Sequence, residues 1–260
     1  MSFAAAFLDR LAATTWPALH TQPMESWLLR AHPALPSRRS SSVLAVGSYP
    51  SGENWLPAIE AFYQEYRLPV RFHVSDASPD DLDDCLEQLG YTVEMATEVM
   101  TAGIETIATS LYSSAQLEAY YICTREAEAS DSWLDAYMEI EQFRPELRPA
   151  YAQMMARIGG DKRFLQLRHP ENREPVAVGT AILHGEWAGL INIATAAAYR
   201  SQGIGSQMVR YLTDACRQQG VKQLYLQVLA TNEVAKRLYR RAGFERVYGY
   251  HYRTKTQEAP

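Results

Sequence analysis

Several features that mark whole classes of proteins are missing from this sequence of 260 residues. Its three cysteines, Cys85, Cys123 and Cys216, are odd in number and too widely spaced for a zinc motif or a disulfide framework. No stretch reaches the roughly 18–20 apolar residues that a membrane-spanning helix needs. Low-complexity and collagen-like segments are absent too, which excludes the fibrous and disordered classes. The cysteine usage favours a reducing, cytoplasmic setting.

A surplus of basic residues is also missing, because the formal net charge is −5. A protein that neutralises nucleic-acid phosphates needs such a surplus, so we expect no nucleic-acid partner. The apolar segment 1–16 lacks the basic start and cleavage site of a signal peptide and predicts an amphipathic helix, so we expect no membrane partner. What is present is an average globular composition, 47% hydrophobic and 21% charged, in a chain long enough to bury a core.

The sequence carries a weak internal repeat. The order strand, glycine-bearing turn, helix, strand, helix, glycine–aromatic pair and strand occurs over 42–100 and again over 190–253. Aligning Gly90 with Gly243 places Leu86 against Tyr239. We therefore predict a mixed α/β fold with two related halves, domains 1–112 and 113–260.

Hydrophobic periodicity and turn residues predict the individual elements. Ser78 followed by Pro79 predicts a capped helix start, and the Thr- and Ser-rich stretch 103–114 is expected to be a connector. The expected helices cover 1–20, 55–66, 78–89, two stretches within 133–158, 206–219 and 232–242, and the expected strands cover 26–31, 42–46, 70–74, 92–100, 117–125, 164–169, 177–184, 190–195, 223–229 and 244–253.

The strongest chemical signal is the run from Arg200 to Gly205, RSQGIG, between the strand 190–195 and a helix. A glycine-rich turn at a helix start exposes unclaimed backbone N–H groups and the positive end of the helix dipole, which together hold anions. A P-loop needs Gly-Lys-Ser/Thr, but Ser206 and Gln207 follow Gly205, and a dinucleotide fingerprint needs a glycine where Met208 stands. Taken alone, the run is equally well explained as a tight strand-to-helix turn.

A second motif makes the assignment more specific. The run 200–205 resembles the Arg/Gln-x-x-Gly-x-Gly/Ala loop of the GNAT superfamily of acyl-CoA-dependent N-acyltransferases, and the second signature of that family resembles Asn232, Ala235, Leu238–Tyr239 and Gly243–Phe244. Two motifs in the right order are far more specific than either one. The resemblance covers 117–253 well and the first half only faintly, and it implies a tandem GNAT-like fold whose N-terminal copy is degenerate.

The resemblance implies acetyl-CoA as acyl-donor substrate and no metal. The loop N–H groups would hold the pyrophosphate, and the strand 193–195 would run beside the peptide-like pantetheine arm. Some side chains of the basic helix would meet the adenosine phosphates, although a solvated helix face explains that run equally well. The residues assigned to the cofactor are Ile193, Ala194, Thr195, Arg200, Ser201, Gln202, Gly203, Ile204, Gly205, Ser206, Asn232 and Lys236.

Tyr239 is the expected catalytic acid, because a phenol placed at the thioester sulfur can donate to the leaving thiolate. An aromatic core residue on an amphipathic helix is the alternative. Glu186 is the first choice for the general base that removes a proton from the attacking amine, with His184, Glu139, Glu141 or a water relay as alternatives. No cysteine has the surroundings of a nucleophile, so direct attack in a ternary complex is preferred.

In the first half, the loop 49–54 has one glycine, a proline without N–H, and Glu53 where a phosphate would lie. Leu86 replaces the tyrosine, so this half resembles the degenerate half of tandem-GNAT proteins. The expected function is transfer of an acetyl group to a primary amine on a small molecule or peptide, by a monomer or homodimer. A non-catalytic acyl-CoA-binding sensor is the alternative, and a purely structural protein is the third possibility.

Overall fold

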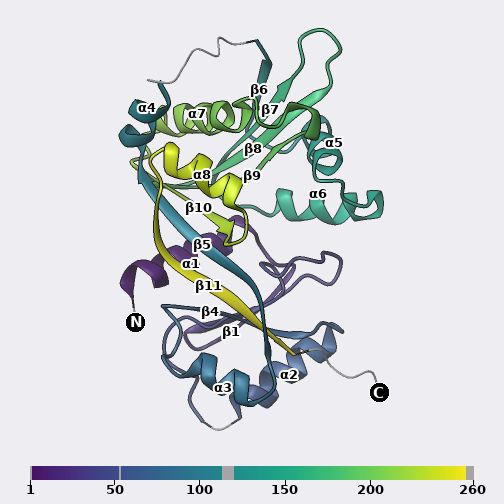
Figure 1. Ribbon diagram of the computed structural model, residues 1–260. Helices are drawn as coiled ribbons and strands as arrows, with labels where there is room; N and C mark the ends of the chain where they lie inside the picture. Colours follow the sequence, from purple (N-terminus) through teal and green to yellow (C-terminus); the bar gives the residue numbers. More distant parts are fainter. Residues whose placement is uncertain (1, 53, 113–119, 256–260) are drawn as a thin grey trace. The chain divides into compact units, whose positions relative to one another are not determined.

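A computed structural model describes residues 2–52, 54–112 and 120–255 of the chain (Figure 1). The chain forms two compact units. The first comprises Met1–Glu98, Leu229–Thr231 and Val247–Pro260, and the second comprises Val99–Val228 and Asn232–Arg246. Two long strands, β5 (Thr92–Gly103) and β11 (Glu245–Lys255), contribute residues to both units.

The first unit is a mixed sheet with the strand order β1-β2-β3-β4-β11-β5. Strands β3 and β4 are parallel, whereas β4 and β11 are antiparallel. Side chains from α2 and from one face of the sheet form a core that includes Leu29, Ile59, Tyr63 and Phe72, each fully buried. Its other elements are α1 (Phe3–Thr15), β1 (His20–Met24), β2 (Trp27–Ala31), β3 (Val43–Leu44), α2 (Trp55–Glu65), β4 (Val70–Ser75) and α3 (Leu82–Gln88).

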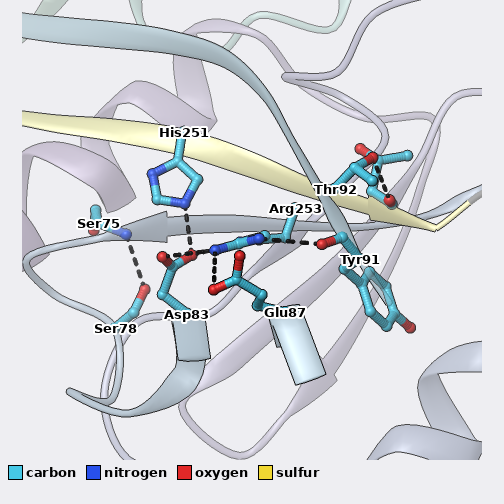
Figure 2. A network of polar contacts seen from close by, with 9 residues as sticks. Ser75, Ser78, Asp83, Glu87, Tyr91, Thr92, His251 and Arg253 are labelled. Carbon is cyan, nitrogen blue, oxygen red and sulfur yellow. Dashed lines mark hydrogen bonds and ion pairs between the residues drawn. The ribbon is translucent and has the colours of Figure 1, made fainter. Parts of the chain in front are cut away.

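A polar network joins α3 to β11 within the first unit (Figure 2). The Arg253 guanidinium donates from Nε and Nη2 to the two carboxylate oxygens of Asp83, at 2.8 and 3.0 Å, and from Nη1 to the carbonyl of Tyr91 at 3.1 Å. His251 Nε2 lies 2.7 Å from Asp83 Oδ1. This bidentate pair fixes the helix on the last strand of the chain.

The second unit has the strand order β5-β10-β9-β8-β7-β6. Its core combines the sheet with side chains of α4, α7 and α8. Alternate residues of a strand point to opposite faces, and Gly179 of β8 faces Met208 and Leu212 of α7, while α5 packs beside β8 without joining that core. The elements are α4 (Ile104–Tyr112), β6 (Ile122–Glu126), α5 (Asp131–Ile140), η1 (Pro145–Leu147), α6 (Arg148–Ala156), β7 (Asp161–Arg168), β8 (Pro175–His184), β9 (Trp187–Thr195), η2 (Ala197–Tyr199), α7 (Ile204–Arg217), β10 (Gln223–Leu229) and α8 (Glu233–Arg241).

The internal repeat is visible in the hydrogen bonds. After α3, the N–H of Tyr91 donates to the carbonyl of Leu86 at 2.9 Å, and after α8 the N–H of Phe244 donates to the carbonyl of Tyr239 at 3.0 Å. Each bond spans a glycine with positive φ, Gly90 or Gly243. The alignment of Leu86 with Tyr239 is therefore supported by equivalent backbone geometry.

The last strands of the two copies are exchanged. β11 ends the second copy but pairs antiparallel with β4 of the first, and β5 ends the first copy but adjoins β10 of the second (Figure 1). This exchange explains why the compact units are discontinuous in sequence. They do not coincide with the consecutive domains 1–112 and 113–260, whose boundary remains a prediction.

The mixed α/β prediction is confirmed, with three local corrections. The expected connector 103–114 contains helix α4, whose residues Ile104, Ile107 and Leu111 pack into the core. Ser78 does not cap α3, because its hydroxyl accepts from the N–H of Ser75 and the helix begins at Leu82. The expected first helix ends at Thr15, and a strand, β1, follows it. Part of the strand expected over 117–125 lies outside the described residues.

Within the described part of the chain, every helix is too short or too polar to cross a membrane. The same residues contain no cluster of three His, Cys, Asp or Glu side chains arranged to hold a metal ion.

Candidate active site

Strands β9 and β10 part in the middle of the second unit. Their parallel pairing runs from Trp187 with Gln223 to Leu190 with Leu226, and in the described structure it extends no further. On its other side, β9 stays paired with β8 up to Thr195. The edge of β9 from Ile191 to Thr195 therefore offers backbone N–H and C=O groups to a ligand.

A β-bulge lies at the same point of β9. The register with β8 passes from Val178–Ala194 to Thr180–Ile191, so that Asn192 and Ile193 together oppose one residue. Asn192 adopts a left-handed conformation with φ of 55°. The bulge turns the strand locally and changes the direction of its backbone groups where β10 departs.

The open edge of β9 leads to the N-terminus of α7. Gly203 is the N-cap residue, no side chain caps the helix, and the first turn contains no acidic residue. The first helical bond runs from the N–H of Gln207 to the carbonyl of Gly203, so the N–H groups of 204–206 have no acceptor within the helix. Arg200 is exposed beside this turn and donates to the carbonyl of Thr195 at 3.1 Å. The arrangement suits an anionic ligand.

The two glycines of the loop also have structural reasons. Gly203 has a φ of 80°, which disfavours other residues. A side chain at Gly205 would come within 2.6 Å of Leu238 in α8, so glycine allows the two helices to approach. Ser201, Gln202 and Gly203 are exposed, Gly205 and Ser206 are half-buried, and Ile204 is buried in the core.

Tyr239 lies on α8 in the core of the second unit, 9% exposed, with its ring 5.9 Å from that of Phe244. Burial raises the pKa of its phenol to about 12. In the described structure its hydroxyl makes no hydrogen bond, yet it is not among the fully enclosed unpaired atoms. The hydroxyl is therefore protonated and available to a ligand.

The expected general base, Glu186, lies in the turn before β9, at the end of the strand opposite the loop. At ~3.3 Å per residue, the nine residues of β9 separate Glu186 from the loop by ~30 Å. Its exposed carboxylate is ion-paired with Lys222. His184 lies at the same end, paired with Trp187, and burial lowers the pKa of its imidazole. Nothing in this geometry tests the base assignment directly, and it remains a prediction.

Glu141 lies closer to the loop. It caps the C-terminus of α5, burial raises the pKa of its carboxyl, and the charge of Arg200 acts on it in the opposite direction. The interaction places Glu141 within electrostatic reach of the loop arginine. Glu139, the other carboxylate considered on this helix, is exposed.

Two further expected cofactor residues have partners in the protein. Asn232 is the N-cap of α8, and its side chain accepts from the N–H of Ala235 at 3.1 Å. Lys236 is buried and its ammonium lies 2.7 Å from a carboxylate oxygen of Glu233. Both stand near the open end of β10, but each has a structural task that is independent of a ligand.

One residue in this region was not expected from the sequence. Asn192 has a buried side-chain oxygen, Oδ1, without a hydrogen-bond partner in the described structure. The available signal was an asparagine within the apolar strand LINIAT, because asparagine is rare in strands. The buried cysteines offer no nucleophile, since burial raises the pKa of the thiols of Cys123 and Cys216.

Comparisons with known proteins agree over nearly the whole chain. Residues 6–253 match the family described as "Probable histone acetyltransferase Rv0428c C-terminal". The chain is 34% identical over 248 residues to the Bacillus subtilis protein "Uncharacterized N-acetyltransferase YobR", covering 95% of this chain and 97% of that protein. Over 83 residues it is 32% identical to the Escherichia coli ribosomal protein bS18-alanine N-acetyltransferase, covering 32% of this chain and 56% of that enzyme.

Solved structures show the same fold. A GCN5-related N-acetyltransferase from Kribbella flavida has a TM-score of 0.68 at 16% identity, covering 98% of this chain and 96% of that chain. A tandem GNAT protein from the clavulanic acid biosynthesis pathway has a TM-score of 0.66 at 11% identity, covering 97% of this chain and 89% of that chain. The expected tandem GNAT-like architecture is thereby confirmed. The chain belongs to the GNAT superfamily of N-acetyltransferases, within the family that its residues 6–253 match.

Proposed function

We propose that this acyltransferase moves the acetyl group of acetyl-CoA to a primary amine by direct attack in a ternary complex. The observation that carries the proposal is the open edge of β9, which ends at the uncapped N-terminus of α7. This geometry fits the donor, because a peptide-like pantetheine arm can pair with a free strand edge and a pyrophosphate with a helix N-terminus. Arg200 adds a positive charge beside the proposed phosphate site.

Acetyl-CoA supplies an acetyl thioester, and the protein has to position its carbonyl carbon and stabilise the departing sulfur. As the C–N bond to the amine forms and the C–S bond breaks, negative charge develops on sulfur. The Tyr239 hydroxyl donates a hydrogen bond to that sulfur. Because the pKa of this phenol is about 12, it remains protonated throughout the neutral range.

The amine has to lose a proton before it attacks, since an alkyl ammonium has a pKa near ~10. Of the carboxylates considered, Glu141 fits the loop end of β9 better than Glu186, because it lies within electrostatic reach of Arg200. Burial raises the pKa of Glu141 towards the neutral range, which improves a general base. It takes the proton directly or through water, and the second amine proton leaves as the amide forms.

The acceptor is a primary amine, on a small molecule or at the N-terminus or a lysine of a peptide. The likeness to the bS18-alanine enzyme supports an alanyl peptide as the first acceptor to test. The cytoplasmic setting expected from the cysteines is compatible with each of these acceptors.

The proposal is tested by calorimetry with acetyl-CoA and by thiol release in the presence of an alanyl peptide, a lysine-containing peptide and spermidine. We expect saturable binding, turnover with at least one amine, and a kcat about 10²-fold lower in Tyr239→Phe with unchanged acetyl-CoA affinity. Tyr66→Phe, at a tyrosine of the first unit, is the control and should retain full activity.

Three outcomes would change the assignment. Normal turnover in Tyr239→Phe would refute the leaving-group role. Binding without turnover of any amine would favour a non-catalytic acyl-CoA sensor. A well-folded protein that gives no heat with acetyl-CoA would remove the proposed function altogether.

A further inference from the structure

The bulge in β9 places one polar side chain where the strands part. Asn192 and Ile193 form the bulge, two residues after Leu190, the last residue of β9 that pairs with β10. The conformation of Asn192, with φ of 55°, is one that asparagine tolerates and glycine accepts without strain. The backbone alone therefore explains a residue permissive of positive φ, but it does not require a carboxamide.

The carboxamide of Asn192 is only half satisfied. Its Nδ2 lies 3.9 Å from the sulfur of Met155, which is a weak acceptor, and its Oδ1 is buried without a partner in the described structure. An unpaired buried acceptor is unfavourable, and native proteins contain few of them. An amide oxygen only accepts hydrogen bonds, so a ligand that satisfies it has to bring an N–H or O–H group.

The surroundings of Asn192 suit an amine. Met155 shares a face of α6 with Tyr151, four residues earlier, and the ring of Tyr151 stacks on Phe143 with centroids 4.8 Å apart. The ring of Tyr137, on α5, lies 5.9 Å from that of Tyr151. Aromatic faces attract cations, and Glu141 follows Tyr137 at the end of α5.

The two reacting groups belong on different sides of β9. Tyr239, proposed to meet the leaving sulfur, lies in the core formed with α7 and α8. The Asn192 side chain contacts α6 instead, through Met155. Because the nucleophile approaches the carbonyl carbon from a different direction than the leaving group departs, the α6 side is the side of the incoming amine.

We propose that Asn192 is a positioning residue for the acceptor, whose Oδ1 accepts a hydrogen bond from the attacking nitrogen of a primary amine. This inference rests on the proposed function and adds the group that orients the nucleophile. It also gives a reason for an asparagine at a position where glycine would satisfy the backbone.

Asn192→Gly tests the inference, because glycine keeps the left-handed backbone and removes only the carboxamide. With the best amine among an alanyl peptide, a lysine-containing peptide and spermidine, we expect the KM for that amine to rise about tenfold or more. The acetyl-CoA dissociation constant and the melting temperature should stay unchanged. Arg173→Gly is the matched control, since Arg173 is exposed, has a φ of 63°, and lies in the turn between β7 and β8.

Asn192→Asp gives a second, independent readout. The carboxylate keeps an acceptor oxygen and holds the ammonium form of the substrate more firmly, so the rising limb of kcat/KM against pH should move to higher pH. An unaltered amine KM in Asn192→Gly together with an unaltered pH profile in Asn192→Asp would overturn the inference and leave the proposed function standing. Absence of acetyl-CoA binding to the wild-type protein would instead overturn both.

Discussion

A buried phenol and a departing thiolate have unequal acidities, and this limits what Tyr239 can contribute. The pKa of Tyr239 is about 12, whereas an ordinary thiol has a pKa of ~8.5. Full proton transfer from the phenol to the thiolate is therefore unfavourable, and the main contribution is a hydrogen bond to developing charge. The pH dependence of turnover in the neutral range should then report the amine and its base, not Tyr239.

Asp83 links pH to stability in the first unit. Its contacts with Arg253 lower the pKa of the carboxyl from 3.8 to about 2, against the effect of burial, and His251 adds to the shift (Figure 2). A depressed folded-state pKa stabilises the protein above pH ~4, and this contribution is lost as the pH falls towards 2. Because the side chain of Asp83 is 37% exposed, we expect only about 1 kcal/mol from the pair at pH 7.

Asp83→Asn should lower the free energy of unfolding by that amount at pH 7 and have almost no effect near pH 2. Urea titrations at several pH values measure the difference. Asp84→Asn is the matched control, because Asp84 stands in the same first turn of α3 and is exposed. Equal losses in both variants would mean that the helix terminus, and not the Arg253 pair, accounts for the effect.

At the scale of elements, the N-terminus of α7 can be tested without disturbing its packing. A substitution at Gly205 would collide with Leu238 and confuse binding with folding. Ser206 lies in the same turn and is half-buried. In Ser206→Glu, the carboxylate should favour the helix by about 0.3–1 kcal/mol but repel a pyrophosphate, so acetyl-CoA affinity should fall at least tenfold while the melting temperature holds or rises.

Ser206→Gln controls for side-chain size without charge and should bind acetyl-CoA more tightly than Ser206→Glu. Calorimetry and thermal unfolding of the two variants give the comparison. If both bind the donor as the wild type does, the helix N-terminus is not the phosphate site.

Local sequence signals predicted most elements but not the irregular ones. Gln223–Leu229 was expected as a strand with these bounds, and the RSQGIG run correctly marked the start of α7. Helix α4 was hidden by its Thr and Ser residues, although Ile104, Ile107 and Leu111 have helical spacing. The bulge at Asn192 depends on pairing with β8, a long-range contact that has no local signal. The same limitation left Glu186 as the expected base, because its distance from the loop follows from the direction of β9.

At the scale of the whole chain, the exchange of β5 and β11 makes each half incomplete by itself. The strand that pairs with β4 comes from the C-terminal end of the chain, and the strand beside β10 comes from the first copy. The repeat predicted two related halves but could not reveal the exchange, because the same hydrophobic pattern fits either partner. Sequence boundaries and folding units consequently differ.

The exchange predicts the behaviour of the separated halves. A fragment 113–260 lacks both β5 and α4, so Leu224 of β10 and Phe244 after α8 lose neighbours of their core. We expect this fragment to show no cooperative thermal transition and to bind no acetyl-CoA in calorimetry, whereas co-expression with 1–112 restores both. Fragment 99–260 is the control, because it retains the part of β5 and the helix that belong to the second unit, and it should be more structured by circular dichroism. Cooperative unfolding and full donor affinity of 113–260 alone would contradict a folding role for the exchanged strand, since burial of the core would then be complete without it.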